Sequence, residues 1–503
     1  MKGFFLPLTC ITVFFLGSTV SLSGASEPAP RPNIFLALGD NWAWPHAGAL
    51  GDPTVKTPVF DRIAREGLLF DHAFCPVPSC SPTRSCLITG RAAHQLGEAA
   101  SLWSIFRKFD AFTELLEKGG YEVGYSGKGW SPGKFLEYGW SKNPAGRRYR
   151  NFEEFMEKRD RSRPFFFWYG NVDVALGQWR YGPEAWGEME PESVVVAPSM
   201  PDTREVRESI LAYYGGVQRQ DQAVGKSVSR LEKDGLLENT LVIYTSDNGW
   251  QMPRGLANCY DSGTHIPLAM RWGKHFQAGR RISDFVSLTD FAPTFLDLAG
   301  IAVPRAMTGT SFADILSGKE STPARDHVFL ERERHANVRK GNLSYPIRAI
   351  RTRDYLYLWN LRPDRWPAGD PKAWISVGNY GDVDGSWAKE FILKHKDDPK
   401  FRDFYNWSFA KRPAEELYDV RKDPYQLVNL ARDPGHQEIR RRLRARVETW
   451  MRETGDPRVD QTFAGWDKYP YFGGTVVDEE GNLKPRKKPW ENRMYIGSKV
   501  KSP

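Results

Sequence analysis

Acidic, amide and lysine side chains follow four short apolar runs at the points where each run ends. The segments are Gly39-Asp40-Asn41, Gly127-Lys128, Asn171-Val172-Asp173 and Ser246-Asp247-Asn248. Carboxylate and amide oxygens are hard ligands that suit Ca²⁺ or Mg²⁺. A lysine close to such a cation could bind an anionic substrate. If the fold brings these segments together, they predict a cation-assisted site for an anionic group.

Four cysteines lie outside the apolar N-terminus, which contains Cys10. They are Cys75, Cys80, Cys86 and Cys259. Two disulfides are the ordinary alternative for such a set in an oxidising compartment. Three of the four fall within a dozen residues and the last lies far downstream, which does not resemble a disulfide framework. We therefore expect a special role for one of them, and the sequence leaves any pairing open.

Alternating strands and helices are expected to position these side chains. Apolar spacing and flanking glycines predict strands at 33–38, 121–126, 164–170 and 240–245, and helices at 58–68, 111–118 and 203–233. This alternation favours an α/β fold with a large, mostly parallel sheet flanked by helices. Such sheets bind ligands just beyond the carboxyl ends of their strands. Asp40, Lys128 and Asp247 should therefore converge on one rim of the sheet.

The pattern changes beyond about residue 345. Residues 347–351 and 355–358 alternate like antiparallel strands, Trp- and Asp-rich loops follow, and 437–452 has helical spacing. We expect a catalytic domain at 32–343 and a smaller α+β C-terminal subdomain with an antiparallel sheet at 344–463. An extended basic tail is predicted at 464–503.

The N-terminus has the pattern of a signal peptide at 1–25. Lys2 precedes an apolar run from Phe4 to about Gly17, and small residues suited to cleavage follow at Ser23-Gly24-Ala25. The run is short for a membrane span, and no other apolar stretch approaches about 20 residues. We expect a secreted or periplasmic protein without stable membrane insertion, with a retained anchor as the alternative.

The charge balance is basic, with a formal net charge of +8 at pH 7 and a pI of about 9.0. Such a surface would attract polyanions, unless it is generally basic without a specific partner. No zinc-finger, RNP or helix-turn-helix pattern appears, so we expect no nucleic-acid partner.

The segment from Cys80 to Arg91 closely resembles the sulfatase signature, Cys-x-Pro-Ser/Thr-Arg followed by Thr-Gly-Arg. The resemblance runs from about Pro32 to Arg452 and implies an alkaline-phosphatase-like fold. The other matching landmarks, in order, are Arg31-Pro32-Asn33 with Asp40, Lys56-Thr57-Pro58, Ser246-Asp247-Asn248-Gly249, Tyr260-Asp261-Ser262-Gly263, Asp290-Phe291-Ala292-Pro293-Thr294, Glu416-Leu417-Tyr418-Asp419 and Asp423-Pro424.

The resemblance implies that dedicated formylglycine-generating machinery oxidises Cys80 to formylglycine. In the family the hydrated aldehyde attacks sulfur, and its second hydroxyl expels sulfate by restoring the aldehyde. A divalent cation is also implied, with Ca²⁺ favoured and Mg²⁺ possible. Arg84 would hold the hydrated residue, and Lys128 would bind a sulfate oxygen. The helix expected to begin near Thr83 would add its positive end. The implied cation ligands are Asp40, Asn41, Asp247, Asn248 and the residue at position 80.

Four positions depart from the family pattern. Asn41 stands where the family usually has a second aspartate, so the site loses a negative charge. Trp130 stands where a histidine commonly follows the lysine. Val172-Asp173-Val174-Ala175 occupies the place of a His-containing segment. The best match to a downstream basic residue is Leu256, although Arg254 lies close by.

These departures remove the usual general acid and one sulfate clamp, and a missing general acid costs about 10²–10⁴ in rate. His94, His265 and His335 are candidate substitutes, and the candidate substrate-binding residues are His94, Arg254 and His335. A catalytically impaired protein that binds sulfated glycan is therefore an alternative to the enzyme. A phosphatase-like hydrolase is a further alternative, but its metals need several histidines, and the nine present have no metal-ligand spacing.

Details of the sequence favour the sulfamidase, or heparan N-sulfatase-like, branch of the family. They are His94-Gln95-Leu96-Gly97, His335 ahead of Ser344-Tyr345-Pro346-Ile347-Arg348, and the Glu-Glu-Leu-Tyr-Asp run around Leu417. We expect hydrolysis of a sulfate ester or sulfamate on a sulfated polysaccharide or oligosaccharide, and algal or mucin glycans fit as well as glycosaminoglycans. Several tryptophans near the motifs could bind sugar faces or pack around the rim. They are Trp42, Trp44, Trp103, Trp130 and Trp250.

Overall fold

The computed structural model describes residues 31–319, 324–372 and 378–473, two short strands at 475–477 and 483–485, and residues 1 and 3. Met1–Pro30 and Arg31–Pro503 are separate units, and the second contains all the elements below. The predicted signal peptide lies outside the described residues except for Met1 and Gly3. Among the described residues, no helix combines the length and apolar character that crossing a membrane requires.

An eight-stranded sheet forms the centre of this unit, in the order β10-β2-β9-β8-β1-β7-β4-β6. The four strands predicted from the sequence are neighbours in it and run parallel. Only β9 runs antiparallel to both of its neighbours, so the sheet is mostly parallel, as predicted. The strands are β1 (Asn33–Gly39), β2 (Leu68–Phe74), β4 (Glu122–Gly127), β6 (Arg147–Arg148), β7 (Phe165–Gly170), β8 (Thr240–Ser246), β9 (Leu268–Arg271) and β10 (Arg280–Ser287).

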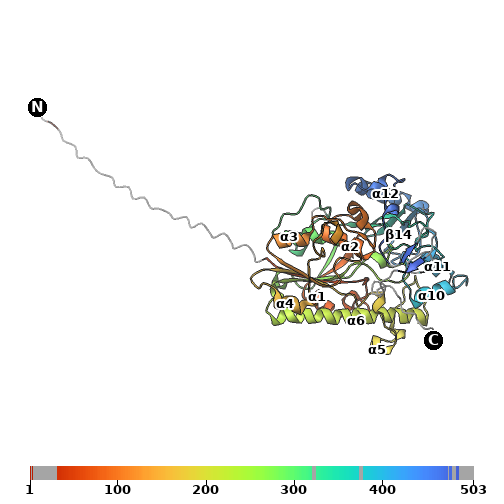
Figure 1. Cartoon of the computed structure of the whole chain (residues 1–503), viewed down its shortest axis with the longest axis horizontal. Helices are drawn as coiled ribbons and strands as arrows, with labels where there is room; N and C mark the ends of the chain where they lie inside the picture. The colour runs from red at the N-terminus through yellow and green to blue at the C-terminus, as the bar shows by residue number, and fades with distance from the viewer. Residues whose placement is uncertain are drawn as a thin grey trace. The chain divides into compact units, whose positions relative to one another are not determined.

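Helices cover both faces of the sheet. In Figure 1, α6 (Arg204–Lys233) runs along one face with α1 (Pro58–Glu66) and α4 (Phe152–Lys158). The other face carries α2 (Cys80–Thr89) and α3 (Phe112–Lys118), joined by α8 (Phe291–Leu298). The side chains of β1 alternate between the two cores, since Leu36 packs with the second set and Phe35 with the first. Burial on both faces explains why β1 is a continuous apolar run in the sequence.

A second sheet is antiparallel throughout and has the order β11-β12-β13-β14. Its strands are β11 (His327–Arg332), β12 (Ile347–Thr352), β13 (Tyr355–Asn360) and β14 (Glu415–Asp419), and α12 (Gln437–Glu453) packs against it. Although β11 precedes residue 344, where we expected the subdomain to begin, it pairs with β12. In the predicted tail, Trp466 is buried and its Nε1 donates to Gly97 O at 2.9 Å.

The segment 361–414 joins β13 to β14, and we call it the β13–β14 insertion. It contains α10 (Trp387–Lys394) and α11 (Arg402–Phe409), and its residues 373–377 lie outside the described part. Ala388 N in α10 donates to Ser209 Oγ of α6 at 3.2 Å. The insertion therefore links the smaller sheet to the helical layer on one face of the larger sheet.

The four cysteines from Cys75 onward are buried and free. The structure contains neither of the two disulfides that were the ordinary alternative for this set. Cys80 remains available for a separate role.

Candidate active site

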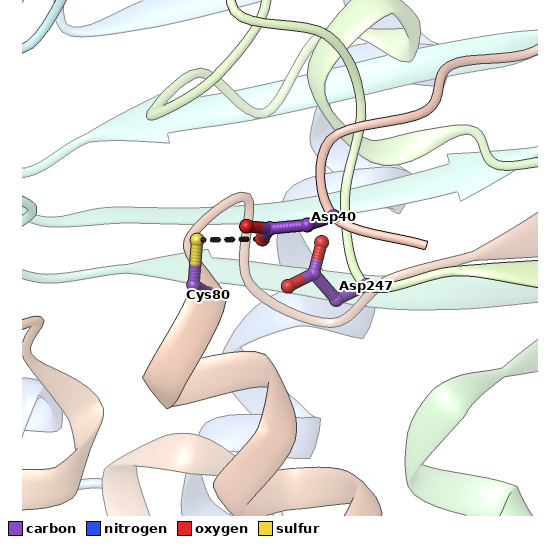
Figure 2. A group of neighbouring side chains, drawn as sticks. All are labelled: Asp40, Cys80 and Asp247. Atoms are coloured by element: carbon purple, nitrogen blue, oxygen red, sulfur yellow. Dashed lines mark hydrogen bonds between the residues drawn. The ribbon is translucent and has the colours of Figure 1, made fainter. Parts of the chain in front are cut away.

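The carboxyl ends of β1 and β8 bring Asp40 and Asp247 together. Gly39 and Ser246 are partners in the parallel register, so the residues that follow them emerge side by side. Cys80 faces both carboxylates from the start of α2 (Figure 2). Its Sγ lies 3.4 Å from Asp40 Oδ1, and one ligand atom of each of the three residues lies within 4.8 Å of the others. Residues far apart in the sequence thus form one cluster at the predicted rim.

Helix α2 begins at Cys80, three residues before the start expected near Thr83. Ser79 takes the extended conformation of an N-cap, with φ −162° and ψ 132°, so the helical turn starts directly after it. Cys80 is therefore the first helical residue and lies at the positive end of the helix dipole.

Two basic side chains neutralise the two carboxylates. Lys128 Nζ donates to Asp40 Oδ1 at 2.6 Å. Arg84 Nε donates to Asp247 Oδ2 at 2.9 Å, and its Nη1 donates to the carbonyl oxygens of Lys128 and Gly129 at 2.7 and 2.8 Å. Arg84 is completely buried, so all of these contacts are shielded from water.

The ionisation of the two carboxyl groups reflects these contacts. Burial alone would raise the pKa of Asp40, but Lys128 and Arg84 outweigh it and hold that pKa below its ordinary value. Burial raises the pKa of Asp247 to about 6, although Arg84 opposes the shift. The negative charge of Asp40 also raises the pKa of Asp247. A bound cation would favour the ionised form of both carboxyl groups.

The position of Lys128 depends on a close approach between two strand ends. Lys128 directly follows β4, and its backbone N donates to the carbonyl oxygen of Gly170, the last residue of β7, at 2.9 Å. A Cβ added at Gly170 would lie 2.0 Å from Lys128 O, so only glycine allows this contact.

Two amides complete the cluster. Asn41 has φ 73°, a left-handed conformation that asparagine tolerates better than most residues. Its backbone N donates to Asp247 Oδ1 at 3.1 Å, and its Oδ1 accepts from Asn248 Nδ2 at 2.6 Å. Asn248 Oδ1 is buried and has no hydrogen-bond partner among the described residues.

The donor set fits a hard divalent cation. The buried Asn248 Oδ1 is an oxygen in need of a partner, and the amide of Asn248 contacts that of Asn41. Carboxylate and amide oxygens are the ligands that Ca²⁺ and Mg²⁺ accept. The chemistry of these donors therefore fits the cation expected at this cluster.

The cluster is deeply set but not sealed. Cys80 and Asp40 each keep 5% of their surface exposed, and the Lys128 side chain keeps 8%. Each of these residues therefore keeps a small exposed fraction.

The residues that replace the family's usual histidines cannot act as general acids. Trp130 is buried, stacks on Phe106 with ring centroids 5.0 Å apart, and donates from Nε1 to Ser85 Oγ at 2.8 Å. Val172 and Ala175, which stand at the histidine positions of the second segment, are partly exposed and apolar. Neither they nor Trp130 can donate a proton to a leaving group.

Two candidate substrate-binding residues lie away from the cluster. His94 Nδ1 is 3.0 Å from Glu331 Oε2, and its Nε2 is 2.9 Å from Thr454 Oγ1. Arg254 donates to the carbonyl oxygens of Trp407 and Gln426 at 2.8 and 2.6 Å. The polar atoms of both residues are engaged in contacts with the smaller sheet and the segments around it, and their substrate-binding role stays a prediction.

The remaining two histidines differ in position. His265 is stacked on Trp44 and Phe74, with ring centroids 4.5 Å away in each case, and is buried. His335 Nδ1 lies 2.8 Å from Ser79 Oγ, next to Cys80. Of the three candidate substitute acids, only His335 borders the cluster.

Most of the tryptophans near the motifs pack in the interior. Trp42, Trp130 and Trp250 are buried, whereas Trp44 and Trp103 are partly exposed. Packing is therefore the role of the first three, and only the last two could present a ring to a sugar.

The sequence analysis missed two residues that border the site, Gln251 and Asp384. Gln251 Oε1 accepts from Asn41 Nδ2 at 2.9 Å, and Gln251 Nε2 donates to Asp384 Oδ2. Gln251 follows the Asp247-Asn248 motif by a few residues, which is a weak signal. Nothing in the sequence pointed to Asp384, because it lies in the β13–β14 insertion.

Comparison with known proteins identifies the family. Residues 32–301 match the family model described as Sulfatase, and residues 254–371 match N-sulphoglucosamine sulphohydrolase, C-terminal. The chain belongs to the sulfatase family. This sulfatase is 30% identical to human N-sulphoglucosamine sulphohydrolase, over 90% of this chain and 95% of that protein. The predicted family and enzyme class, a sulfuric ester hydrolase, are confirmed.

More distant relatives agree. The sulfatase is 25% identical to an ulvan-active sulfatase of Formosa agariphila, over 85% of this chain and 76% of that protein. The solved structure of BT4656 in complex with its substrate D-Glucosamine-2-N, 6-O-disulfate has a TM-score of 0.58 at 19% identity, and covers 86% of this chain and 100% of that one. The predicted fold class is confirmed.

Proposed function

We propose that this sulfatase hydrolyses sulfate-ester or sulfamate groups of a sulfated glycan, using a formylglycine derived from Cys80 and a divalent cation. The observation that carries the proposal is the meeting of Cys80 with Asp40 and Asp247 at the ends of β1 and β8. The three ligand atoms come from segments far apart in the sequence, and Lys128 lies beside them.

The proposed cation is Ca²⁺, with Mg²⁺ as the alternative. Its protein ligands would be oxygens of Asp40, Asn41, Asp247 and Asn248, together with the residue at position 80. When bound, the cation supplies positive charge that favours an ionised nucleophile and offsets the charge of the sulfate.

The environment of Cys80 favours modification over thiolate chemistry. Burial raises the pKa of the Cys80 thiol well above its ordinary value, and the nearby carboxylates raise it further. A protonated thiol is a weak nucleophile. The hydrated formylglycine would supply the nucleophilic hydroxyl instead.

Lys128 and Arg84 have different roles in this proposal. The Lys128 ammonium has three donors, and among the described residues Nζ pairs only with Asp40, so donors remain for a sulfate oxygen. Arg84 directs its guanidinium at Asp247 and two backbone carbonyls. Arg84 therefore positions Asp247 and the chain at Lys128.

His335 is proposed to bind the substrate. Burial lowers the pKa of His335 to about 4, so the ring is neutral near pH 7 and is a poor source of a proton. A neutral imidazole can still donate one hydrogen bond and accept another. Its place beside Ser79 would orient a sugar bearing the sulfate.

The second candidate function is a glycan-binding protein with impaired turnover. Apolar residues at the positions of the family's histidines, Trp130, Val172 and Ala175, favour it. Loss of a general acid costs about 10²–10⁴ in rate. Leaving groups that need no protonation would escape that cost.

The substrate and location are proposed from the relatives and the N-terminus. Human N-sulphoglucosamine sulphohydrolase and the ulvan-active sulfatase carry sulfated-glycan substrates in their names. We propose a sulfated polysaccharide or oligosaccharide of glycosaminoglycan type as the substrate, and secretion or periplasmic export through residues 1–25. Formylglycine-generating machinery of the host would modify Cys80.

Two measurements test the proposal. Mass spectrometry of the peptide containing Cys80 should show the aldehyde mass, and sulfate should be released from a panel of N- and O-sulfated saccharides. Cys80→Ala should abolish release, whereas Cys86→Ala, which removes another buried thiol of α2, should keep it. Unmodified cysteine in an active preparation would overturn the formylglycine, and binding without release would favour the second candidate.

A further inference from the structure

We propose that Asp384 and Gln251 form a hydrogen-bond relay that orients the amides of Asn41 and Asn248, so that both present oxygen to the cation. The inference rests on the cation site of the proposed function. Asp384 and Gln251 act as positioning residues. The relay explains how an asparagine can serve where the family usually has a second aspartate.

The orientation of Gln251 is fixed from both sides. Its Nε2 donates to a carboxylate oxygen of Asp384, which can only accept while it is ionised. Its Oε1 accepts at 2.5 Å from the backbone N–H of Leu176, which can only donate. Turning the amide over would set acceptor against acceptor and donor against donor. The amide oxygen of Gln251 must therefore face Leu176 and Asn41.

The orientation of Asn41 follows from that of Gln251. Its side chain lies 2.9 Å from Gln251 Oε1, so the atom at that position must be the donor Nδ2. Asn41 Oδ1 then faces the other way and lies 3.9 Å from Cys80 Sγ. The amide oxygen of Asn41 is thereby directed to the cluster of Cys80 and the carboxylates.

The last member of the relay is Asn248. Its Nδ2 donates to Asn41 Oδ1 at 2.6 Å and to Gly249 O at 2.9 Å, and both of these oxygens are acceptors. Asn248 Oδ1 is left buried and without a partner among the described residues. A buried acceptor without a partner is unfavourable. A bound cation would satisfy it, because amide oxygens are ligands of Ca²⁺.

The β13–β14 insertion holds Asp384 in place. Asp382 accepts from Arg332, from Arg339 and from Ala336 N, each within 2.9 Å. Lys389 Nζ donates to the carbonyl oxygen of Val383 at 2.6 Å. Asp384 lies past residue 371, where the match to the C-terminal family model ends. The anchor of the relay therefore comes from outside both matched regions.

The charges around Asp384 permit the acceptor role. Burial raises the pKa of Asp384 to about 6, and the negative charges of Asp382 and Asp40 add to this shift. The hydrogen bond from Gln251 and the positive charge of Lys389 oppose it. Above about pH 6 the carboxylate therefore predominates, and both of its oxygens are acceptors.

The test measures Ca²⁺ binding to the full chain, independently of turnover. Asp384→Asn can present either a donor or an acceptor to Gln251, so one anchor of the relay is lost. The expected result is a 10–100-fold weaker Kd for Ca²⁺ by calorimetry, and a smaller rise in Tm on adding Ca²⁺. Asp370→Asn is the matched control, because Asp370 also lies in the insertion but accepts from Lys340 N. Its Kd should match that of the wild type.

A double-mutant cycle separates orientation from general damage. In the Asn41→Asp background both side-chain oxygens can ligate whichever way they face, so adding Asp384→Asn should not weaken the binding of Ca²⁺. Equal Ca²⁺ affinity of Asp384→Asn and wild type would overturn the relay and leave the proposed function standing. An equal loss in both backgrounds would also overturn it. A wild-type protein that binds neither Ca²⁺ nor Mg²⁺ would remove the cation from the proposed function, and the relay with it.

Discussion

Replacing Lys128 with methionine should weaken the fold, strengthen cation binding and abolish sulfate release. The variant removes the partner of Asp40 from a pair whose side chains are 8% and 7% exposed, with a 2.6 Å contact. Breaking a buried ion pair costs about 3–5 kcal/mol. Arg84 Nη2 remains 3.8 Å from Asp40 Oδ1 and offsets part of that cost. A loss of about 2–3 kcal/mol in the free energy of unfolding is therefore expected without cation.

The same change removes a positive charge from beside the proposed cation site. Charges about 5 Å apart interact by about 3 kcal/mol per unit charge at an effective dielectric constant near 20. Even after partial screening by water, the Kd for Ca²⁺ should fall at least tenfold. Sulfate release should be lost because the donor to the sulfate oxygen is gone.

Chemical denaturation with EDTA, calorimetry with Ca²⁺ and a sulfate-release assay measure the three effects. Lys142→Met is the control, since it breaks a partly exposed lysine–carboxylate pair with Glu117 and should change none of them appreciably. A Ca²⁺ affinity that drops in Lys128→Met would refute the charge argument. Full activity would show that Lys128 does not bind sulfate.

Two further outcomes are expected. Trp130→His, which restores the family's residue, should destabilise the protein by about 3–5 kcal/mol, because the indole fills a buried site and stacks on Phe106. It should not raise turnover, and a rate gain in the sulfate-release assay would contradict this expectation. Burial lowers the pKa of His265 to about 3 and the pKa values of His72 and His335 to about 4. Because the fold keeps these rings neutral, their contribution to stability is fully present above about pH 6.5 and is lost as pH falls toward 4. Each such histidine should lower the free energy of unfolding by up to about 1.4 kcal/mol per pH unit below about pH 6.5. Asp247 and Asp384, whose pKa values burial raises to about 6, act in the opposite direction over the same range. An NMR titration in which the ring resonances of these histidines shift with a pKa near about 6.5 would therefore exclude the effect.

The chemistry of this sulfatase has to proceed without the histidines that its family commonly uses. Trp130, Val172 and Ala175 occupy those positions with apolar side chains, and His335, the candidate histidine next to Cys80, is held neutral. Comparing an aryl sulfate that has a good leaving group with a sulfated sugar would show the consequence. A much larger rate for the aryl sulfate would place the missing proton transfer at the limiting step.

The sequence by itself determined the large sheet and the centre of the site. The strands at β1, β4, β7 and β8 are short apolar runs buried on both faces, and the polar residues that follow them must emerge at one edge because the strands are parallel. Asp40, Lys128, Asp247 and Cys80 could be named for that reason, together with a local signature around Cys80. The apolar runs of the strands and the signature around Cys80 each depend on a few consecutive residues, so they can be recognised in the sequence alone.

Only the tertiary structure decided which of the more distant side chains belong to the site. His335 lies 256 residues from Ser79 in the sequence yet contacts it, whereas Arg254 is held by carbonyl oxygens of the C-terminal subdomain. Asp384 reaches Gln251 from an insertion 133 residues further along the chain. These contacts depend on packing between elements far apart in the chain. The direction of each amide depends on which donors and acceptors the fold places around it, and no local pattern of residues encodes that arrangement.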